Sequence, residues 1–352
     1  MTPKSARLND ALNVSTRHVL PSRSIFNARC GILTPRQRLA LQGVTEMAYT
    51  CSDPAYGERV SAAGNMGWSD APGAADLEIS SEDFAAGPLI ASLDERILAD
   101  IELLGSTGAL DGFLSDAPTL VGPASGLRRH PSSDIQPGCV IDTSDGPVII
   151  DKGARVSRLS YIAGPAYVGE NARIDSAHLC GPVVIGRECR IGGEIECSIF
   201  NDYSNKHHEG FVGHSIVGEW VNLGALTTTS DLKNNYGQIR LESAAPWCGR
   251  PELHRYDTGE IKFGSIISEF VKTAIGTMIN TGSVLDIGSN VFGDRPGKYL
   301  PAFSWGADSA ALYDPDRFLS DAQTIAARRK VTLDDARIAT LRHVRTLAGQ
   351  RV

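Results

Sequence analysis

Aliphatic side chains return every six residues through the middle of the chain, beginning with Ile150, Val156, Ile162, Val168 and Ile174. A period of six fits neither an amphipathic helix nor an alternating strand, whose periods are about 3.6 and about 2 residues. It fits a prism in which three short strands make each turn and one aliphatic side chain per strand points inward. The alternative is chance periodicity in a segment rich in valine and glycine.

The same spacing resumes after each of three interruptions. Its further positions are Ile185, Ile191, Val217, Leu223, Ile267, Thr273, Ile279, Leu285 and Val291. The pattern predicts a mainly β fold, a parallel β-helix of roughly seven or eight coils over residues 134–306. Residues 231–262 break the rhythm with turn-forming dipeptides and prolines, so we expect a long excursion from the prism wall there.

The two ends of the chain lack the sixfold pattern. Thr34 followed by Pro35 predicts a helix start, and residues 90–104 have helical spacing. We expect residues 1–133 to form a small N-terminal α/β domain. Residues 307–352 are expected to form a helical tail, with helices at 314–328 and 332–347 that cover the last coil.

Composition narrows the possible partners and the compartment. The formal net charge of −7 gives no support for a nucleic-acid partner. No stretch of eighteen apolar residues occurs and the N-terminus lacks an apolar signal core, so neither a membrane span nor a secretory signal is expected. The seven cysteines are odd in number and form no C-x-x-C pair, which indicates free thiols and a cytoplasmic protein.

The stretch Tyr203–Tyr236, YSNKHHEGFVGHSIVGEWVNLGALTTTSDLKNNY, concentrates side chains that can perform chemistry. It holds adjacent histidines, lysines, asparagines and hydroxyls, and it lies inside the repeat. Because the repeat fixes where each side chain points, these residues are the candidate site.

The coil region resembles the left-handed β-helix acyltransferases of the hexapeptide-repeat superfamily. It is most similar to the acetyltransferase half of the bifunctional GlmU-type enzymes and to their sugar-nucleotidyltransferase relatives. The segments that carry the resemblance are Gly192–Glu196, Tyr203–Ala225, Ser230–Gly237, Thr273–Gly293 and Pro301–Gly306. They lie within roughly residues 140–306, about half of the chain.

The N-terminal region departs from these relatives. Cys30–Arg36 resembles a short segment near their start, but the glycine-rich G-x-G-T-R loop that cradles nucleotide phosphates is absent. The region is also too short for a complete nucleotidyltransferase domain. We therefore interpret residues 1–133 as a remnant, or as a unit that binds the acceptor or caps the prism, and we expect no nucleotidyl transfer.

The resemblance implies transfer of an acyl group from acyl-CoA, with acetyl-CoA favoured, to a small-molecule acceptor. An amine is favoured over a hydroxyl as the acceptor group. His208 falls at the family's general base, with Phe211 and Gly213 following in step. A neutral imidazole suits that role near pH 7, and the alternative is an ordinary histidine on the coil surface. Asn222 and Ala225 match positions beside the acceptor and the thioester, where the Ala225 N–H would hold the oxyanion.

Other positions are assigned to the acceptor. Asn235 and Tyr236 match a pair on a loop over the acceptor, although Asn-Asn-Tyr-Gly is also an ordinary turn. Lys206 is a candidate ligand for an acidic acceptor group or a CoA phosphate, or simply a solvated lysine. Glu194 and Glu196 stand where sugar-nucleotide enzymes carry basic residues. Two carboxylates there favour a cationic or amino acceptor, unless Glu194 only shapes a coil corner.

In this superfamily CoA lies in the groove between neighbouring prisms, which implies a homotrimer with active sites between subunits. The polar residues expected beside the donor are Ser265, Thr277, Asn280 and Ser283. No metal is required for this chemistry.

Two other functions remain open from the sequence. Some left-handed β-helices bind zinc with three histidines and hydrate carbon dioxide, and His178, His208 and His214 are the candidate ligands here. Their spacing does not match the His-x4-His pair of that family. The third possibility is a non-catalytic scaffold or regulatory subunit, which would have no need for His208, Asn222 and the Asn234–Tyr236 stretch together.

Overall fold

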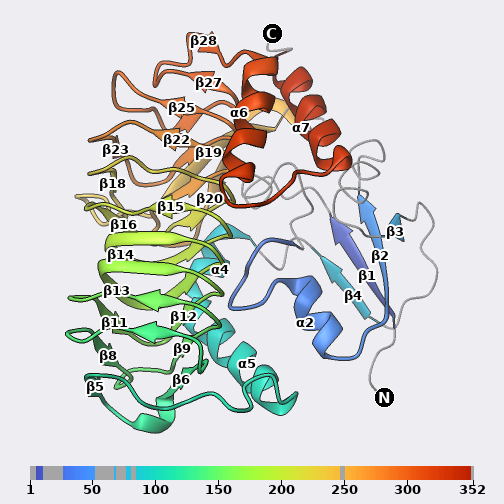
Figure 1. The fold of residues 1–352 in the computed structure, drawn as a ribbon. Helices are drawn as coiled ribbons and strands as arrows, with labels where there is room; N and C mark the ends of the chain where they lie inside the picture. The colour runs from blue at the N-terminus through green and yellow to red at the C-terminus, as the bar shows by residue number, and fades with distance from the viewer. Residues whose placement is uncertain are drawn as a thin grey trace.

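The residues that repeat every six positions line the inside of a parallel β-helix in the computed structural model (Figure 1). The structure describes residues 5–10, 27–51, 67–68, 77–80, 85–245 and 250–349. Ile150, Val156, Ile162, Val168 and Ile174 are all fully buried in one hydrophobic core. The predicted fold class, a left-handed parallel β-helix with a small α/β N-terminal domain and C-terminal helices, is confirmed.

Each coil contributes strands to three faces of the prism, and equivalent strands of successive coils pair in parallel. The first face contains β7 (Asp134–Ile135), β10 (Arg155–Val156), the start of β13 (Arg173–Ile185), the start of β14 (Arg190–Phe200), β15 (Asn205–Lys206), β22 (Lys272–Thr273), β25 (Asn290–Val291) and β27 (Ser304–Trp305). The antiparallel strand β28 (Ala311–Leu312) extends it. The second face contains β5 (Leu120–Val121), β8 (Val140–Asp142), β11 (Tyr161–Ala163), the middle of β13 and β14, β16 (Phe211–Gly213), β18 (Thr228–Thr229) and β23 (Met278–Ile279).

The third face contains β6 (Leu127–Arg129), β9 (Val148–Ile150), β12 (Ala166–Val168), the ends of β13 and β14, β17 (Ile216–Val217), β21 (Ser265–Ile267), β24 (Ser283–Leu285) and β26 (Tyr299–Leu300). Because β5 and β6 already pair with the prism, its first strands precede the expected boundary at residue 134.

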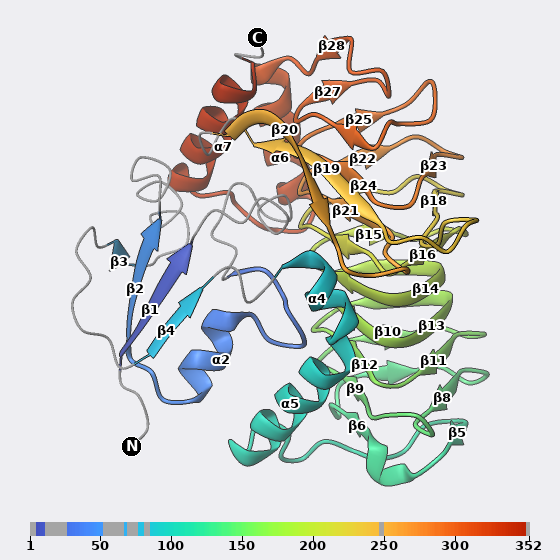
Figure 2. The same ribbon diagram turned by 180° about the vertical axis from the view of Figure 1, so that it is seen from behind.

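The third face is apolar on both sides because a second layer covers it. Its outward residues include Val184, Ile199 and Ile216, and they share a core with Leu93 and Ile97 of the N-terminal region. That region contains α2 (Pro35–Leu41), α4 (Ala86–Ala91), α5 (Leu93–Ser106) and a parallel sheet of β1 (Ser5–Asp10), β2 (Glu46–Cys51), β3 (Gly67–Trp68) and β4 (Leu77–Ser80). Figure 2 shows α4 and α5 lying along the prism. The N-terminal region therefore protects part of the third face from solvent.

A buried charged contact also joins the N-terminal region to the coils. The Arg29 guanidinium donates to Asp202 at 3.0 Å, and the Arg29 backbone N–H donates to Asn201 at 2.9 Å. Arg29 is only 8% exposed. Because both partners belong to one coil, this contact fixes the position of the N-terminal region along the prism axis.

The expected excursion at 231–262 contains an antiparallel hairpin, β19 (Arg240–Ala245) and β20 (Arg250–Asp257). The hairpin adds Ile239 and Leu241 to the core over the third face. Among the described helices, none combines the length and apolar character needed to span a membrane. The five cysteines whose side chains the structure describes are all free thiols.

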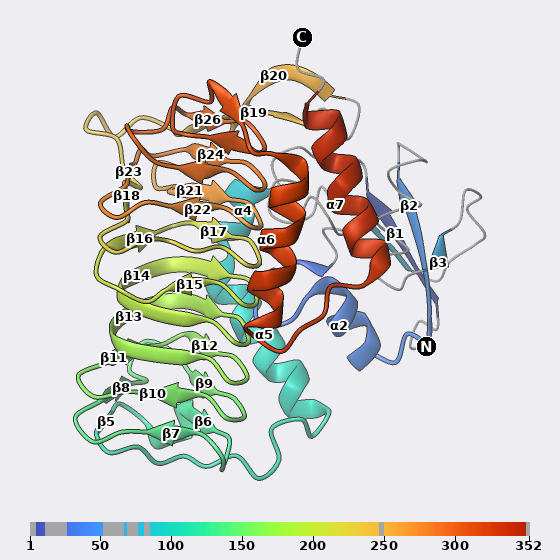
Figure 3. The same ribbon diagram turned by 45° about the horizontal axis from the view of Figure 1, so that its top comes forward.

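The C-terminal helices form where the sequence predicts them, as α6 (Pro315–Ala327) and α7 (Asp335–Ala348). They do more than cover the last coil. Figure 3 shows α6 running along the side of the stack, and it packs on a corner column that contains Trp220, Phe270 and Phe303. These three corner residues have φ between 56° and 61°, a left-handed turn that the prism imposes on bulky side chains.

Helix α7 is fastened to the same corner by a buried ionic triad. Arg337 lies 3.0 Å from a Glu219 carboxylate oxygen and donates to Glu269 at 2.8 Å. All three residues are buried, and the guanidinium also lies 5.6 Å from the centre of the Phe270 ring. One cation therefore compensates two carboxylates that belong to successive coils.

We expect Arg337→Met to lower the free energy of unfolding by about 3–5 kcal/mol, because it leaves both buried carboxylates without their cation. Urea denaturation at pH 7 and one fixed protein concentration measures this loss. Arg342→Met, on an exposed position of the same helix, should leave the unfolding midpoint nearly unchanged. Equal losses in both variants would show that the triad contributes nothing specific.

Candidate functional site

Three residues predicted to be catalytic, His208, Asn222 and Ala225, come together on two consecutive coils. The Asn205 side-chain amide donates to the side-chain oxygen of Asn222 at 2.8 Å, and these residues are 17 apart in the sequence. The Leu226 N–H donates to the Glu209 carbonyl at 2.8 Å with the same offset. Ala225 therefore lies directly over His208, one coil further along, at the usual strand spacing of about 4.8 Å.

His208 lies exposed where the chain leaves the first face and turns toward the second. Its ring meets the His207 ring edge to face, with centroids 4.9 Å apart. The Nδ1 atom of His207 lies 3.2 Å from the Asp175 carboxylate, which stands two coils earlier in the stack. His207 is thus held against the prism while His208 faces solvent, which leaves the His208 imidazole accessible to a small molecule.

Lys206 occupies an inward position, contrary to the ligand contact expected for it. Its side chain has no exposed surface, and its ammonium group donates to the Gly192 carbonyl at 3.2 Å and to the His208 carbonyl. Burial lowers the pKa of Lys206 from 10.5 to about 8. A small molecule on the prism surface does not reach this ammonium group. The structure instead gives Lys206 the role of holding the backbone at His208.

Glu194 and Phe211 are paired neighbours on the second face, around the corner from His208. Glu196 follows two residues later on the same side of β14, where Lys262 lies 3.4 Å from its carboxylate. The side chains of Glu194 and Phe211 both point outward, because Ile195 and Val212 fill the inward positions. Glu194 is exposed, so a carboxylate stands beside a partly exposed aromatic ring close to the His208 corner.

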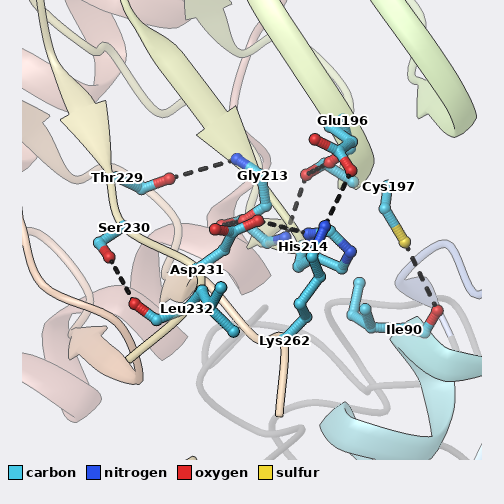
Figure 4. A network of polar contacts seen from close by, with 12 residues as sticks. Ile90, Glu196, Cys197, Gly213, His214, Thr229, Ser230, Asp231, Leu232 and Lys262 are labelled. Carbon is cyan, nitrogen blue, oxygen red and sulfur yellow. Dashed lines mark hydrogen bonds and ion pairs between the residues drawn. The ribbon is translucent and has the colours of Figure 1, made fainter. Parts of the chain in front are cut away.

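His214 forms a second polar cluster on this face, shown in Figure 4. Its Nδ1 atom donates to the Asp231 carboxylate at 2.7 Å, and this hydrogen bond holds the pKa of Asp231 below its ordinary value. Asp231 and Lys262 stand at the two ends of the excursion. The backbones of Leu232 and Lys262 also pair there in an isolated antiparallel β-bridge. The cluster therefore anchors both ends of the excursion to the prism, through His214 and Glu196.

Asn235 and Tyr236 lie on an exposed turn within the excursion. The Asn235 side-chain oxygen accepts from the Gly237 N–H at 3.1 Å, which is the turn chemistry considered from the sequence. Tyr236 is 68% exposed. Their assignment to the acceptor stays a prediction.

The residues assigned to the donor divide into two groups. Thr277 lines a surface groove of about 360 Å³ together with Ile275, Met278 and Phe292, and Asn280 is exposed on the next turn. The Gly276 N–H donates to the Ala225 carbonyl at 2.8 Å, so this groove begins one coil beyond Ala225.

Ser265 and Ser283, in contrast, are fully buried. The Ser265 N–H donates to Ser215 Oγ at 3.0 Å, within a column of serines that continues through Ser283 along the third face. A donor in a surface groove does not reach a side chain without exposed surface. The structure therefore argues against these two contacts.

The zinc alternative required His178, His208 and His214 to converge. Within the described ranges, no three His, Cys, Asp or Glu side chains are grouped as a metal site would need. His214 is instead paired with Asp231, and His208 lies at a different corner of the prism.

No protein-family model matches the chain. Over part of its length it is similar to proteins named bifunctional protein GlmU. The protein from Acaryochloris marina is 32% identical over 119 residues, which is 32% of this chain and 25% of that protein. The protein from Trichodesmium erythraeum is 37% identical over 82 residues, 22% of this chain and 17% of that protein. The one from Rippkaea orientalis is 28% identical, covering 34% of this chain and 31% of that protein.

This chain is related to GlmU over about a third of its length. The resemblance stated from the sequence is confirmed to that extent, and the alignments cover no more than a third of these three relatives. Among solved structures, the acetyltransferase domain of PglB from Neisseria gonorrhoeae with acetyl coenzyme A is 12% identical, with 80% of this chain and 95% of that chain covered. PerB from Caulobacter crescentus with CoA and GDP-perosamine is 15% identical, with 83% and 90% covered. Their TM-scores of 0.20 and 0.18 are too low to carry an argument.

The sequence reasoning missed one group of residues that the structure brings together. Arg190 and Lys272 stand in the same register of the first face as Asn205 and Asn222. Applying the repeat to the outward-pointing positions as well as to the inward-pointing ones would have placed these four residues in one column. Arg329, which joins them, lies in the turn directly after α6, and only the docking of that helix reveals it.

The pKa of Lys206 gives a pH test of its position. Because the folded-state pKa is lower than the unfolded value, unfolding takes up a proton between about pH 8 and 10.5, so raising the pH stabilises the folded state. We expect the free energy of unfolding of the wild type to rise relative to Lys206→Met between pH 7 and pH 10. Denaturation curves of both proteins across this range measure the difference. A constant difference would contradict a buried, readily deprotonated Lys206.

Proposed function

We propose that this chain transfers an acyl group from acyl-CoA, with acetyl-CoA favoured, to the amine of a small-molecule acceptor. The observation that carries the proposal is that an exposed His208 lies one coil below Ala225, with Asn222 three residues before Ala225 on the same coil, inside the segment that resembles GlmU. An acyl transfer needs a base, an oxyanion donor and a donor groove, and these residues can supply each of them within two or three coils.

In the proposed reaction His208 acts as the general base. Its neutral imidazole takes a proton from the acceptor amine as the nitrogen attacks the thioester carbonyl. The negative charge that develops on the carbonyl oxygen is stabilised by the Ala225 N–H. The carbon–sulfur bond then breaks, and the CoA thiolate leaves and receives the proton from the imidazolium. Lys206 keeps the backbone at His208 in place through its contact with the His208 carbonyl.

The donor is proposed to lie in the groove lined by Ile275, Thr277 and Phe292, with its thioester directed toward Ala225. The groove supports this because it begins one coil beyond Ala225 at the same corner. The acceptor is proposed to bind on the second face, with Asn222 beside it on the first. There Glu194 and Glu196 provide carboxylates for a cationic amine or amino sugar, and Phe211 provides a flat apolar surface.

We also propose that the protein works as a homotrimer, with sites between subunits that the Asn235–Tyr236 turn would help to close. The third face is covered by the chain itself, whereas large apolar side chains stand exposed at the groove. Ile275 is 76% exposed, Leu226 57% and Met278 52%. Exposed apolar surface of this kind is typical of a protein–protein interface.

We expect His208→Gln to lower kcat by about 10²- to 10⁴-fold, because a general base contributes roughly that much, while leaving acetyl-CoA affinity almost unchanged. Thiol release from acetyl-CoA in the presence of a panel of amines measures turnover, and calorimetry measures binding. His254→Gln, on exposed β20, is the matched control and should match the wild type. Full activity in His208→Gln would remove the proposed base, and failure of the wild type to bind acetyl-CoA would remove the proposed donor.

The proposed trimer gives a separate test. Ile275→Asp places a charge in the exposed apolar corner and should convert a trimer to monomers in sedimentation velocity. Leu253→Asp is the control, because Leu253 is 56% exposed on the β19–β20 hairpin, away from this corner. A wild type that sediments as a monomer at micromolar concentration would contradict the proposal.

A further inference from the structure

A cavity of about 420 Å³ lies between the first face of the prism and α6. Its floor is formed by Arg190, Asn205, Asn222 and Lys272, which occupy one outward column of successive coils. Its roof comes from the last turns of α6 and the residues that follow it. The cavity is on the first face, whereas the proposed donor groove runs along the next corner of the prism.

The lining is strongly cationic. Arg190, Lys272, Arg328 and Arg329 line the cavity, and Asp321 is the one carboxylate among its lining residues. Asp321 is already engaged, because it accepts a hydrogen bond from the Tyr313 hydroxyl, to which Lys272 also donates at 3.3 Å. The lining therefore carries four cationic side chains against one carboxylate that is already engaged.

Arg190 and Arg329 are close enough to affect each other. The pKa of Arg329 is lowered by burial first and then by the charge of Arg190. Arg329 donates to the Glu188 carbonyl at 3.2 Å, while the Glu188 carboxylate lies 4.0 Å away. The Nε atom of Arg190 is buried and has no hydrogen-bond partner in the described part of the chain. A buried guanidinium N–H without an acceptor is costly, and a second cation beside it adds repulsion.

The position of α6 explains only part of this arrangement. Cations at the C-terminal end of a helix interact favourably with its exposed carbonyl groups, which accounts for Arg328 and Arg329. Arg190 belongs to a β-strand and gains nothing from that effect. Arg190 nevertheless lines the cavity close to Arg329, and two neighbouring guanidinium groups in one cavity favour an anion between them.

We propose that this cavity binds the phosphate group of a small molecule. Paired guanidinium groups bind phosphate oxygens through parallel charge-assisted hydrogen bonds, and an anion between Arg190 and Arg329 would relieve their repulsion. The volume lies within the range of about 300–1,000 Å³ typical of small-molecule sites, so the ligand carries more than the phosphate itself. The Asn205 and Asn222 amides offer further hydrogen bonds to its polar groups. The phosphate belongs either to CoA or to a separate phosphorylated metabolite.

Calorimetric titration of the full chain with inorganic pyrophosphate tests the site. Arg190→Gln and Arg329→Gln should each weaken pyrophosphate binding at least about tenfold, the loss of one charge-assisted contact. Arg155→Gln is the matched control, because Arg155 lies in the same column but outside the cavity, and it should bind like the wild type. Circular dichroism and Tm establish that each variant is folded. If a variant fails to fold, pyrophosphate protection of wild-type α6 in hydrogen exchange replaces it.

No pyrophosphate binding to the wild type, or equal binding to the wild type and both cavity variants, would overturn the proposal. Two further titrations identify the source of the phosphate. Weaker CoA binding by Arg190→Gln assigns the site to the donor, and weaker glucose 6-phosphate binding assigns it to a separate metabolite. Both support the site. None of these measurements uses turnover. The phosphate site can therefore be confirmed if the proposed acyl transfer is disproved, and acyl transfer can be confirmed if the phosphate site is disproved.

Discussion

Every other feature of this protein depends on the parallel stacking of coils around one core, to which each of the three faces contributes a row of inward side chains. Each inward residue, such as Ile174, packs on its equivalents in the coils above and below, and backbone hydrogen bonds run between coils rather than within them. The stacking also brings outward-pointing side chains together, because a side chain that points outward in one coil has a neighbour at the same position in the next. This is how His208 comes to lie under Ala225, and Asn205 beside Asn222.

A stack of coils does not protect its own outer surfaces, and the rest of the chain is arranged around that problem. The N-terminal region and the β19–β20 hairpin together cover the third face, and Arg29 fixes the N-terminal region against one coil. The aromatic corner is covered by α6 and α7, with Arg337 neutralising two buried carboxylates. The first and second faces and the corner between them are left to solvent over much of their length. The candidate site and the exposed apolar side chains are both found there, as expected for a surface that binds ligands or another copy of the chain.

The two polar centres of the exposed region differ in how tightly they are held. His214 is enclosed and paired with Asp231, so its ring is fixed and serves the attachment of the excursion. Among the residues that the structure describes, no carboxylate is paired with His208, and its backbone is held from below by Lys206. An imidazole with a rigid backbone and an accessible ring is suited to proton transfer, whereas an enclosed histidine–carboxylate pair stabilises the structure around it.

The sequence alone determined the prism, its inward residues and the positions of α6 and α7, because period-six spacing and helix capping are local signals that tertiary contacts did not override. Through the family resemblance it also proposed His208, Asn222 and Ala225 as site residues, and their catalytic roles stay a prediction. The sequence analysis was wrong where it treated polar residues at inward positions of the repeat as surface residues. Lys206, Ser265 and Ser283 read as polar candidates, yet all three point inward and are buried. The tertiary structure decided which faces of the prism are covered by other segments of the chain, because the repeat pattern carries no information about that packing. Only the docking of α6 on the first face brings Arg329 to Arg190, because the two belong to segments that share no repeat and meet through long-range packing.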